Sequence, residues 1–213
     1  MVHPGRRPPG RPRHGDPTIP TQDQILRAAG ELFMRLGYRR VTMEMVASAA
    51  GITKAAVYYH FADKPSLVVE ATTGVFHRVA ARTEALLGRP APLYDRLVAV
   101  AEIVLSLPDP FISFEALLRD ARDDLTPAQV AQIRTAEEAI GDLVVGAVTA
   151  AVRGGELAAN TNGLLVAHGY LALMRLGQTR DAQGRPRFPD AAGTARALVD
   201  MLWHGVAGAT SPP

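Results

Sequence analysis

Apolar residues recur at helical spacing along most of the chain from residue 21 onward, and glycines and prolines interrupt the pattern at intervals. In the first amphipathic segment Ile25, Leu32 and Phe33 fall on one face, and Gly37 ends it in the way that glycine commonly ends a helix. No run of alternating β-branched residues, which would indicate a half-buried strand, occurs in the sequence. The pattern therefore predicts an all-α protein.

Capping residues and helix breakers divide the pattern into nine expected helices. Thr42, Thr53 and Asp63 have side chains that favour the position before a helix, and Thr126 precedes a proline that fits a first turn. The expected helices cover residues 21–37, 42–50, 53–61, 63–88, 93–107, 111–123, 126–152, 162–176 and 190–206. Because the first three fall within residues 21–61 and the last two of them are joined by a glycine turn, we expect two domains, a three-helix unit at 21–67 and a larger helical domain at 68–213.

Residues 1–20 differ from the rest because they hold six prolines and four arginines with few apolar side chains. Such a segment cannot bury enough surface to offset its ordering entropy, so we expect a disordered basic arm. Charge is also uneven over the chain: residues 1–67 carry 10 Lys or Arg against five Asp or Glu, whereas the remainder carries 13 against 16. The N-terminal part is therefore suited to a polyanionic partner, and the C-terminal part is not.

The overall composition is that of an ordinary soluble globular protein, with 47% apolar and 21% charged residues among 213. The chain has no cysteine, which excludes disulfides and thiolate metal sites and favours a reducing cytoplasm. Charged residues and glycines break every apolar stretch well before the ~18 residues that a membrane-spanning helix needs. We therefore expect a cytoplasmic protein that does not enter a membrane.

The second and third expected helices carry the strongest functional signal. They are joined at Gly51, and Val57 and Phe61 lie four residues apart in the third helix, so both should pack into the core. The two lysines of the chain, Lys54 and Lys64, both fall in this region. Two short helices joined by a glycine turn form a helix-turn-helix, in which the second helix enters the major groove of DNA.

The third expected helix would present small and polar side chains to the bases. Thr53 and Lys54 can hydrogen-bond a base or a phosphate, small alanines can meet a thymine methyl, and Tyr59 should point outward toward DNA. Tyr58 and Lys64 are placed to contact phosphates, and Thr42 can cap its helix and donate to the DNA backbone. The expected DNA-binding residues are Thr42, Thr53, Lys54, Ala55, Ala56, Tyr58, Tyr59, His60 and Lys64.

In type and spacing, these residues resemble the N-terminal DNA-binding domain of TetR-family regulators. The resemblance runs from Thr21 to Leu67, and it is carried by Thr42, Val46, Ala47, Ala50, Gly51, Ile52, Thr53, the run Val57 to Phe61, Lys64 and Leu67. It implies a bacterial, all-helical homodimer in which the last two helices pair with those of a second subunit. It also implies an effector pocket in the larger C-terminal domain. Pro65 departs from the family pattern, but the first turn of a helix tolerates its missing N–H.

The expected arm offers a second DNA contact. Arg11 and Arg13 lie in a Gly-Arg-Pro context similar to the core of minor-groove hooks, and a narrow A·T-rich groove attracts arginine. The other interpretation of these arginines is a solvated tail that adds non-specific affinity. An architectural DNA-binding protein that uses this arm as its main contact is therefore one alternative function.

The expected C-terminal domain contains candidate ligand and interface residues but no catalytic pattern. Aromatic, imidazole and thioether side chains of several helices could line an effector pocket: Phe76, His77, Phe111, Phe114, Tyr170 and Met174. The last two helices carry more apolar surface than one layer needs, which predicts self-association through Leu165, Leu171, Met174, Leu198, Leu202 and Val206. No spacing brings His, Asp and Glu together as a metal set, so neither a metal nor a cofactor is expected.

The sequence thus predicts a ligand-responsive transcriptional regulator and not an enzyme. We expect a repressor that binds a near-palindromic double-stranded operator as a homodimer and is released by a small, largely apolar effector. A less favoured alternative is an enzyme that acts on a small molecule in the C-terminal pocket. The lack of a nucleophile motif, a phosphate loop or an acid–base pair speaks against that alternative.

Overall fold

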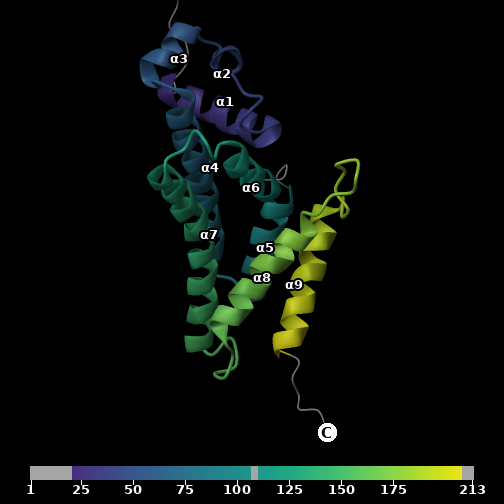
Figure 1. Cartoon of the computed structure of the whole chain (residues 1–213). Helices are drawn as coiled ribbons and strands as arrows, with labels where there is room; N and C mark the ends of the chain where they lie inside the picture. The colour runs from purple at the N-terminus through teal and green to yellow at the C-terminus, as the bar shows by residue number, and fades with distance from the viewer. Residues whose placement is uncertain (1–20, 107–109, 208–213) are drawn as a thin grey trace, which may run out of the picture.

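The computed structural model describes residues 21–106 and 110–207, with the side chains of 110–113 and 205–207 left out of the description (Figure 1). Within these residues the chain forms nine helices: α1 (Thr21–Leu36), α2 (Met43–Ala50), α3 (Lys54–His60), α4 (Lys64–Leu87), α5 (Leu93–Ser106), α6 (Pro110–Asp120), α7 (Pro127–Arg153), α8 (Gly163–Gly177) and α9 (Ala191–Ala207). An isolated bridge between Arg180 and Pro186 is the one β feature of the described chain. The all-α class and the nine helices predicted from the sequence are confirmed.

Local capping explains where several helices begin. The side chains of Thr42, Thr53 and Asp63 accept hydrogen bonds from backbone N–H groups three residues on, at 3.2, 3.2 and 2.8 Å. Thr126 and Gln129 form a full capping box at the start of α7. Each cap satisfies an N–H group that has no partner within its own helix.

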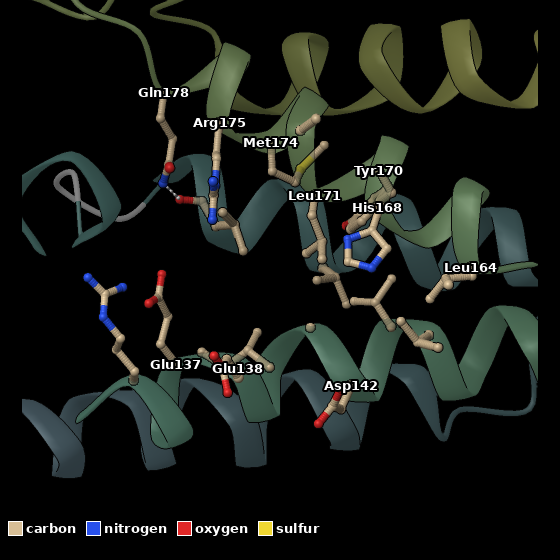
Figure 2. A pocket seen from close by; sticks show the side chains of 18 of the residues that line it. Glu137, Glu138, Asp142, Leu164, His168, Tyr170, Leu171, Met174, Arg175 and Gln178 are labelled. Carbon is tan, nitrogen blue, oxygen red and sulfur yellow. Dashed lines mark hydrogen bonds between the residues drawn. The ribbon is translucent and has the colours of Figure 1, made fainter. Parts of the chain in front are cut away.

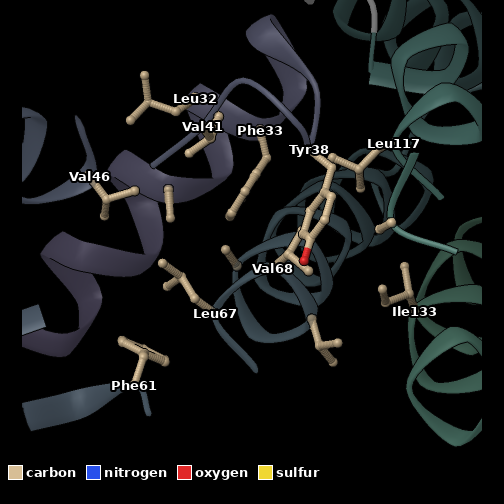
Figure 3. Close-up of a cluster of buried hydrophobic side chains, with 14 of the residues drawn as sticks. Leu32, Phe33, Tyr38, Val41, Val46, Phe61, Leu67, Val68, Leu117 and Ile133 are labelled. Carbon is tan, nitrogen blue, oxygen red and sulfur yellow. The ribbon is translucent and has the colours of Figure 1, made fainter. Parts of the chain in front are cut away.

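A first hydrophobic core lies under α1–α3 and extends well beyond them. Phe33 and Leu67 are fully buried in it, together with Leu117 of α6 and Ile133 of α7 (Figure 3). Phe76, further along α4, belongs to the same core. The domain division expected at residue 67 stays a prediction, and apolar packing is continuous across it.

A second core joins the end of α4 to α5, the C-terminal half of α7, α8 and α9. Its fully or almost fully buried side chains include Leu93, Leu97 and Tyr170. The 24-residue α4 supplies side chains to both cores, with Leu67 near one end and Leu86 near the other. At ~1.5 Å per residue such a helix is about 36 Å long, so it connects the α1–α3 end of the molecule to the second core as one continuous helix (Figure 1).

Across the residues that the structure describes, no helix is both long enough and apolar enough to span a membrane.

Candidate nucleic-acid interface and ligand cavity

The geometry of the α2–α3 pair is set by one turn and two buried side chains. Gly51 adopts φ 69°, in the left-handed region, and the N–H of Ile52 donates to the carbonyl of Ala47 at 3.0 Å. Val57 and Phe61 are 0% and 2% exposed, as their spacing predicted. These contacts fix one face of α3 to the first core and leave its opposite face to solvent (Figure 1).

The solvent face of α3 carries the side chains expected to read DNA. Thr53, Lys54 and Ala55 are exposed, Ala56 is partly buried, and Tyr59 is 86% exposed. The outward position predicted for Tyr59 is therefore confirmed, whereas its contact with DNA stays a prediction.

Rings flank this face on the C-terminal side of α3. Tyr58 is 45% exposed. His60 is half-buried, and its ring lies edge-on to Tyr59 with centroids 5.2 Å apart. Thr42, just before α2, is also exposed, and its hydroxyl oxygen caps the helix by accepting a hydrogen bond from the N–H of Met45.

Lys54 is held by a partner that the sequence did not suggest. Its ammonium forms an ion pair with Glu44 of α2 and lies 5.7 Å from the centre of the Tyr58 ring. The hydrogen bond from Lys54 lowers the pKa of Glu44 and, in return, raises the pKa of the lysine. Ten residues separate the pair in sequence, so only the angle between two helices brings them together.

Lys64 is likewise positioned by an aromatic ring. Its ammonium lies 4.2 Å from the centre of the Tyr38 ring, which stacks on Phe33 in the first core. Burial lowers the pKa of Lys64, and the carboxylate of Asp124 partly opposes that change. Burial, with a contribution from Asp124, raises the pKa of Tyr38. Tyr38 thus holds the ammonium group of Lys64, whose phosphate contact stays a prediction, and no sequence motif pointed to Tyr38.

A cavity of about 620 Å³ lies between α7 and α8, with α5 behind it and one residue of α6 at its edge (Figure 2). Its apolar lining consists of Val100, Val104, Ile140, Gly141, Val144, Val145, Leu164, Tyr170, Leu171, Ala172 and Met174. Its polar lining consists of Glu115, Arg134, Glu137, Glu138, Asp142, His168, Arg175 and Gln178. Figure 2 shows His168, Leu171 and Arg175 of α8 on the side that faces α7. Such a volume is typical of small-molecule sites.

The structure brings together some of the residues expected in the pocket. Tyr170 and Met174 line the cavity, and the Tyr170 hydroxyl donates to the carbonyl of Leu97 at 2.8 Å. Phe76 and Phe114 instead meet each other edge-on in the first core, with centroids 4.8 Å apart. His77 is exposed on α4 and does not line the cavity.

The expected dimer residues divide between the interior and the surface. Met174 and Leu198 are 4% and 6% exposed and belong to the second core, and Leu171 and Leu202 pack partly against it. Leu165 is 69% exposed. The other large apolar side chains exposed on α8 and α9 are Leu164, Leu176 and Met201. The sequence pattern identified these two helices but did not distinguish their inner and outer faces.

Four expected contact residues lie outside the description. Arg11 and Arg13 fall in residues 1–20, and the side chains of Phe111 and Val206 are not described. Among the residues that are described, no group of three or more His, Asp or Glu is arranged to hold a metal ion.

Comparison with known proteins finds a family match for the segment that contains the helix-turn-helix. The sequence profile of the family described as "Bacterial regulatory proteins, tetR family" matches residues 25–71, which span most of α1 through the start of α4. Residues 25–71 of the chain thus match the DNA-binding segment of the TetR family. Among curated TetR-family proteins, the HTH-type transcriptional activator FasR of Mycolicibacterium smegmatis is 30% identical over 145 residues. That alignment covers 65% of this chain and 64% of FasR, so the chain matches just under two thirds of that relative's length.

Solved TetR-family structures share the fold along nearly their whole length. FadR from Bacillus subtilis, in complex with stearoyl-CoA, matches with a TM-score of 0.64 and 16% identity over 87% of this chain and 98% of that one. AibR, in complex with isovaleryl coenzyme A and operator DNA, matches with a TM-score of 0.58 and 20% identity over 85% and 97%. At these identities the likeness establishes the nine-helix fold and not the ligand.

Proposed function

We propose that the protein is a DNA-binding transcriptional regulator that acts as a homodimer and responds to a small ligand. The observation that supports this proposal is that α3 has one buried face and one solvent-exposed face. Its inner face is fixed by the fully buried Val57 and Phe61, and its outer face presents Lys54, Ala55 and Tyr59 to solvent. A rigid helix with small and polar outward side chains is what direct reading of a major groove requires.

The proposed contacts divide into two kinds. Thr53, Lys54, Ala55, Ala56 and Tyr59 would meet base edges, because they lie on the solvent side of α3. The remaining expected contacts, Thr42, Tyr58, His60 and Lys64, flank that surface and would position it on phosphates. The positive balance of the N-terminal part of the chain supports attraction to a polyanion.

A homodimer would place two copies of α3 in successive major grooves, roughly 34–36 Å apart, on a near-palindromic operator. The exposed apolar side chains of α8 and α9, Leu165 and Met201 among them, support pairing of these helices with those of a second subunit. We propose repression as the mode of action, in keeping with release of the operator when the effector binds. The alternative outcome, activation, is the function named for FasR.

The cavity is the proposed effector site. Ile140 lines it and also belongs to the first core, on which α3 is packed. A ligand that moves α7 would therefore move a wall of the core beneath the DNA-reading helix. A small, largely apolar ligand could shift the dimer to a conformation in which the two α3 helices are wrongly spaced for DNA only if it binds that conformation more tightly. The complexes of FadR with stearoyl-CoA and of AibR with isovaleryl coenzyme A support a ligand site in this fold.

The test is selection of DNA by the full chain from a random pool, followed by binding measurements on the selected sequence. We expect a near-palindromic sequence, and we expect Lys54→Ala and Tyr59→Ala each to weaken its binding roughly tenfold. Arg82→Ala is the matched control, because it removes one positive charge from an exposed position on α4, remote from α3. Unchanged binding by the two α3 variants would refute the assigned reading surface.

A further inference from the structure

One residue that lines the cavity has a buried acceptor atom without a hydrogen-bond partner among the described residues. Gln178, at the end of α8, is 8% exposed, and its amide nitrogen donates to the carbonyl of Val104 at 3.1 Å (Figure 2). Its side-chain oxygen Oε1 is buried and makes no hydrogen bond within the described part of the protein. Buried amide oxygens are almost always paired, since leaving one unpaired is costly. Gln178 lines the cavity, so a molecule bound there could supply the missing N–H or O–H donor.

The charges around the cavity favour a positive donor. Among its lining groups, Glu115 and Arg134 form an ion pair at 3.3 Å and offset each other. The lining groups that remain are Glu137, Glu138 and Asp142 on the acidic side and Arg175 on the basic side. The cavity thus has an excess of negative charge, which attracts a cation and repels a polyanion.

Glu137 is the acidic group best placed to meet such a ligand. It is half-buried, and burial raises the pKa of its carboxyl group. The positive charges of Arg175 and Arg134 oppose that effect, whereas the carboxylates of Glu115 and Glu138 add to it. No cation lies within salt-bridge distance of it among the described side chains. Figure 2 shows Arg175 and Gln178 across the cavity from Glu137, toward the same end of it.

The rest of the cavity is suited to an apolar body. Val100, Val104 and Ile140 line it, and Met174 adds a flexible thioether. Tyr170 contributes ring surface, because its hydroxyl is already used in the hydrogen bond to Leu97. The cavity therefore combines an apolar chamber with a polar end that carries Glu137, Arg175 and Gln178.

We propose that the cavity binds a cationic amphiphile, with a protonated amine held by Glu137 and the Oε1 atom of Gln178 and an apolar body against α5 and α7. This inference rests on the proposed function, in which the cavity is the effector site, and it specifies the chemical class of the effector. The proposed ligand class differs from the coenzyme A thioesters named for two solved structures that share this fold.

The experiment compares three probes that share one apolar chain: decylamine, decanol and decanoate. Each is titrated calorimetrically into the full-length protein at neutral pH, where the amine is positively charged and the acid is negatively charged. We expect decylamine to bind at least tenfold more tightly than decanol and decanoate to bind most weakly. Equal binding of the three, tighter binding of decanoate, or no binding of any probe would overturn the inference.

Two variants localise the charge effect. Glu137→Gln preserves the shape of the side chain and removes its charge, so decylamine binding should weaken roughly tenfold to a hundredfold while decanol binding stays the same. Glu84→Gln, at an exposed position of α4 outside the cavity, is the matched control and should change neither. A loss of decylamine binding in both variants, or in neither, would overturn the assignment to Glu137.

DNA binding is measured with the same protein preparation and the operator selected above. If the protein binds that operator and decylamine does not bind the cavity, the inference fails and the proposed DNA-binding function stands. If no DNA is selected although decylamine binds in a manner that depends on Glu137, the regulator proposal fails and the ligand chemistry stands.

Discussion

Two glycines in equally open surroundings should respond to alanine in opposite directions. A Cβ atom built on Gly51 or on Gly146 meets no atom within 4 Å, so packing contributes to neither substitution. Gly51 has φ 69°, where an alanine costs about 1–2 kcal/mol relative to a right-handed conformation. Gly146 lies in the middle of α7, where alanine stabilises a helix by about 0.5–1 kcal/mol relative to glycine. The backbone conformation alone sets the sign.

We expect Gly51→Ala to lower the free energy of unfolding by about 1 kcal/mol and Gly146→Ala to raise it by up to about 1 kcal/mol. For a chain of this length each change corresponds to roughly 2–4 °C in melting temperature. Denaturant unfolding followed by circular dichroism measures both variants, and an unchanged m-value shows that stability itself has changed. A neutral or stabilising Gly51→Ala would refute the left-handed turn between α2 and α3. Gly51→Asn should lose less than Gly51→Ala, because asparagine tolerates this conformation better.

Three further predictions concern the reading surface, its core and the dimer face. Phe61→Ala should cost about 3–5 kcal/mol of stability, because the ring is 2% exposed, and thermal unfolding would show it; a loss below ~1 kcal/mol would contradict the packing of α3. Glu44→Ala should tighten DNA binding in a fluorescence anisotropy titration, since it removes a negative charge and frees Lys54, and this gain should be smaller in a Lys54→Ala background, where only the loss of the negative charge acts; an equal gain in both backgrounds would contradict the role of the ion pair. Leu165→Glu should shift sedimentation toward the monomer, whereas Ala85→Glu on the exposed face of α4 should not.

Local features made the helices predictable from the sequence. Thr42, Thr53 and Asp63 each cap the helix that follows through a bond to a residue three positions away. A bond of that range depends on neighbouring residues alone, so it is visible in the sequence pattern. The burial of Val57 and Phe61 followed from helical spacing in the same way.

Contacts between helices were not predictable in this way. The pairing of Lys54 with Glu44, and of Lys64 with Tyr38, depends on how α2, α3 and α4 cross. A helical pattern shows which side of a helix is apolar, but not which neighbour that side meets.

The cavity illustrates the same limit. Tyr170 and Met174 were expected in a pocket because large and soft side chains often line one, and both line it. Phe76 and Phe114 share that chemistry, yet they fill the first core. Glu137 and Gln178 gave no signal in the sequence, since a charged residue on a long helix is most often solvated. Only the approach of α7 and α8 places them at a cavity.

The continuous first core bears on how the DNA specificity of this protein could be re-engineered. A chimera joined at residue 67 would pack the three-helix unit of another protein against Leu117, Leu118 and Ile133. These side chains fit the apolar surface of the present three-helix unit. The part of the chain that could be exchanged without disturbing this core is therefore smaller than the segment that matches the family profile. Grafting only the outward positions of α3, such as Ala55 and Tyr59, would exchange what the helix reads and leave intact the apolar surface on which it rests.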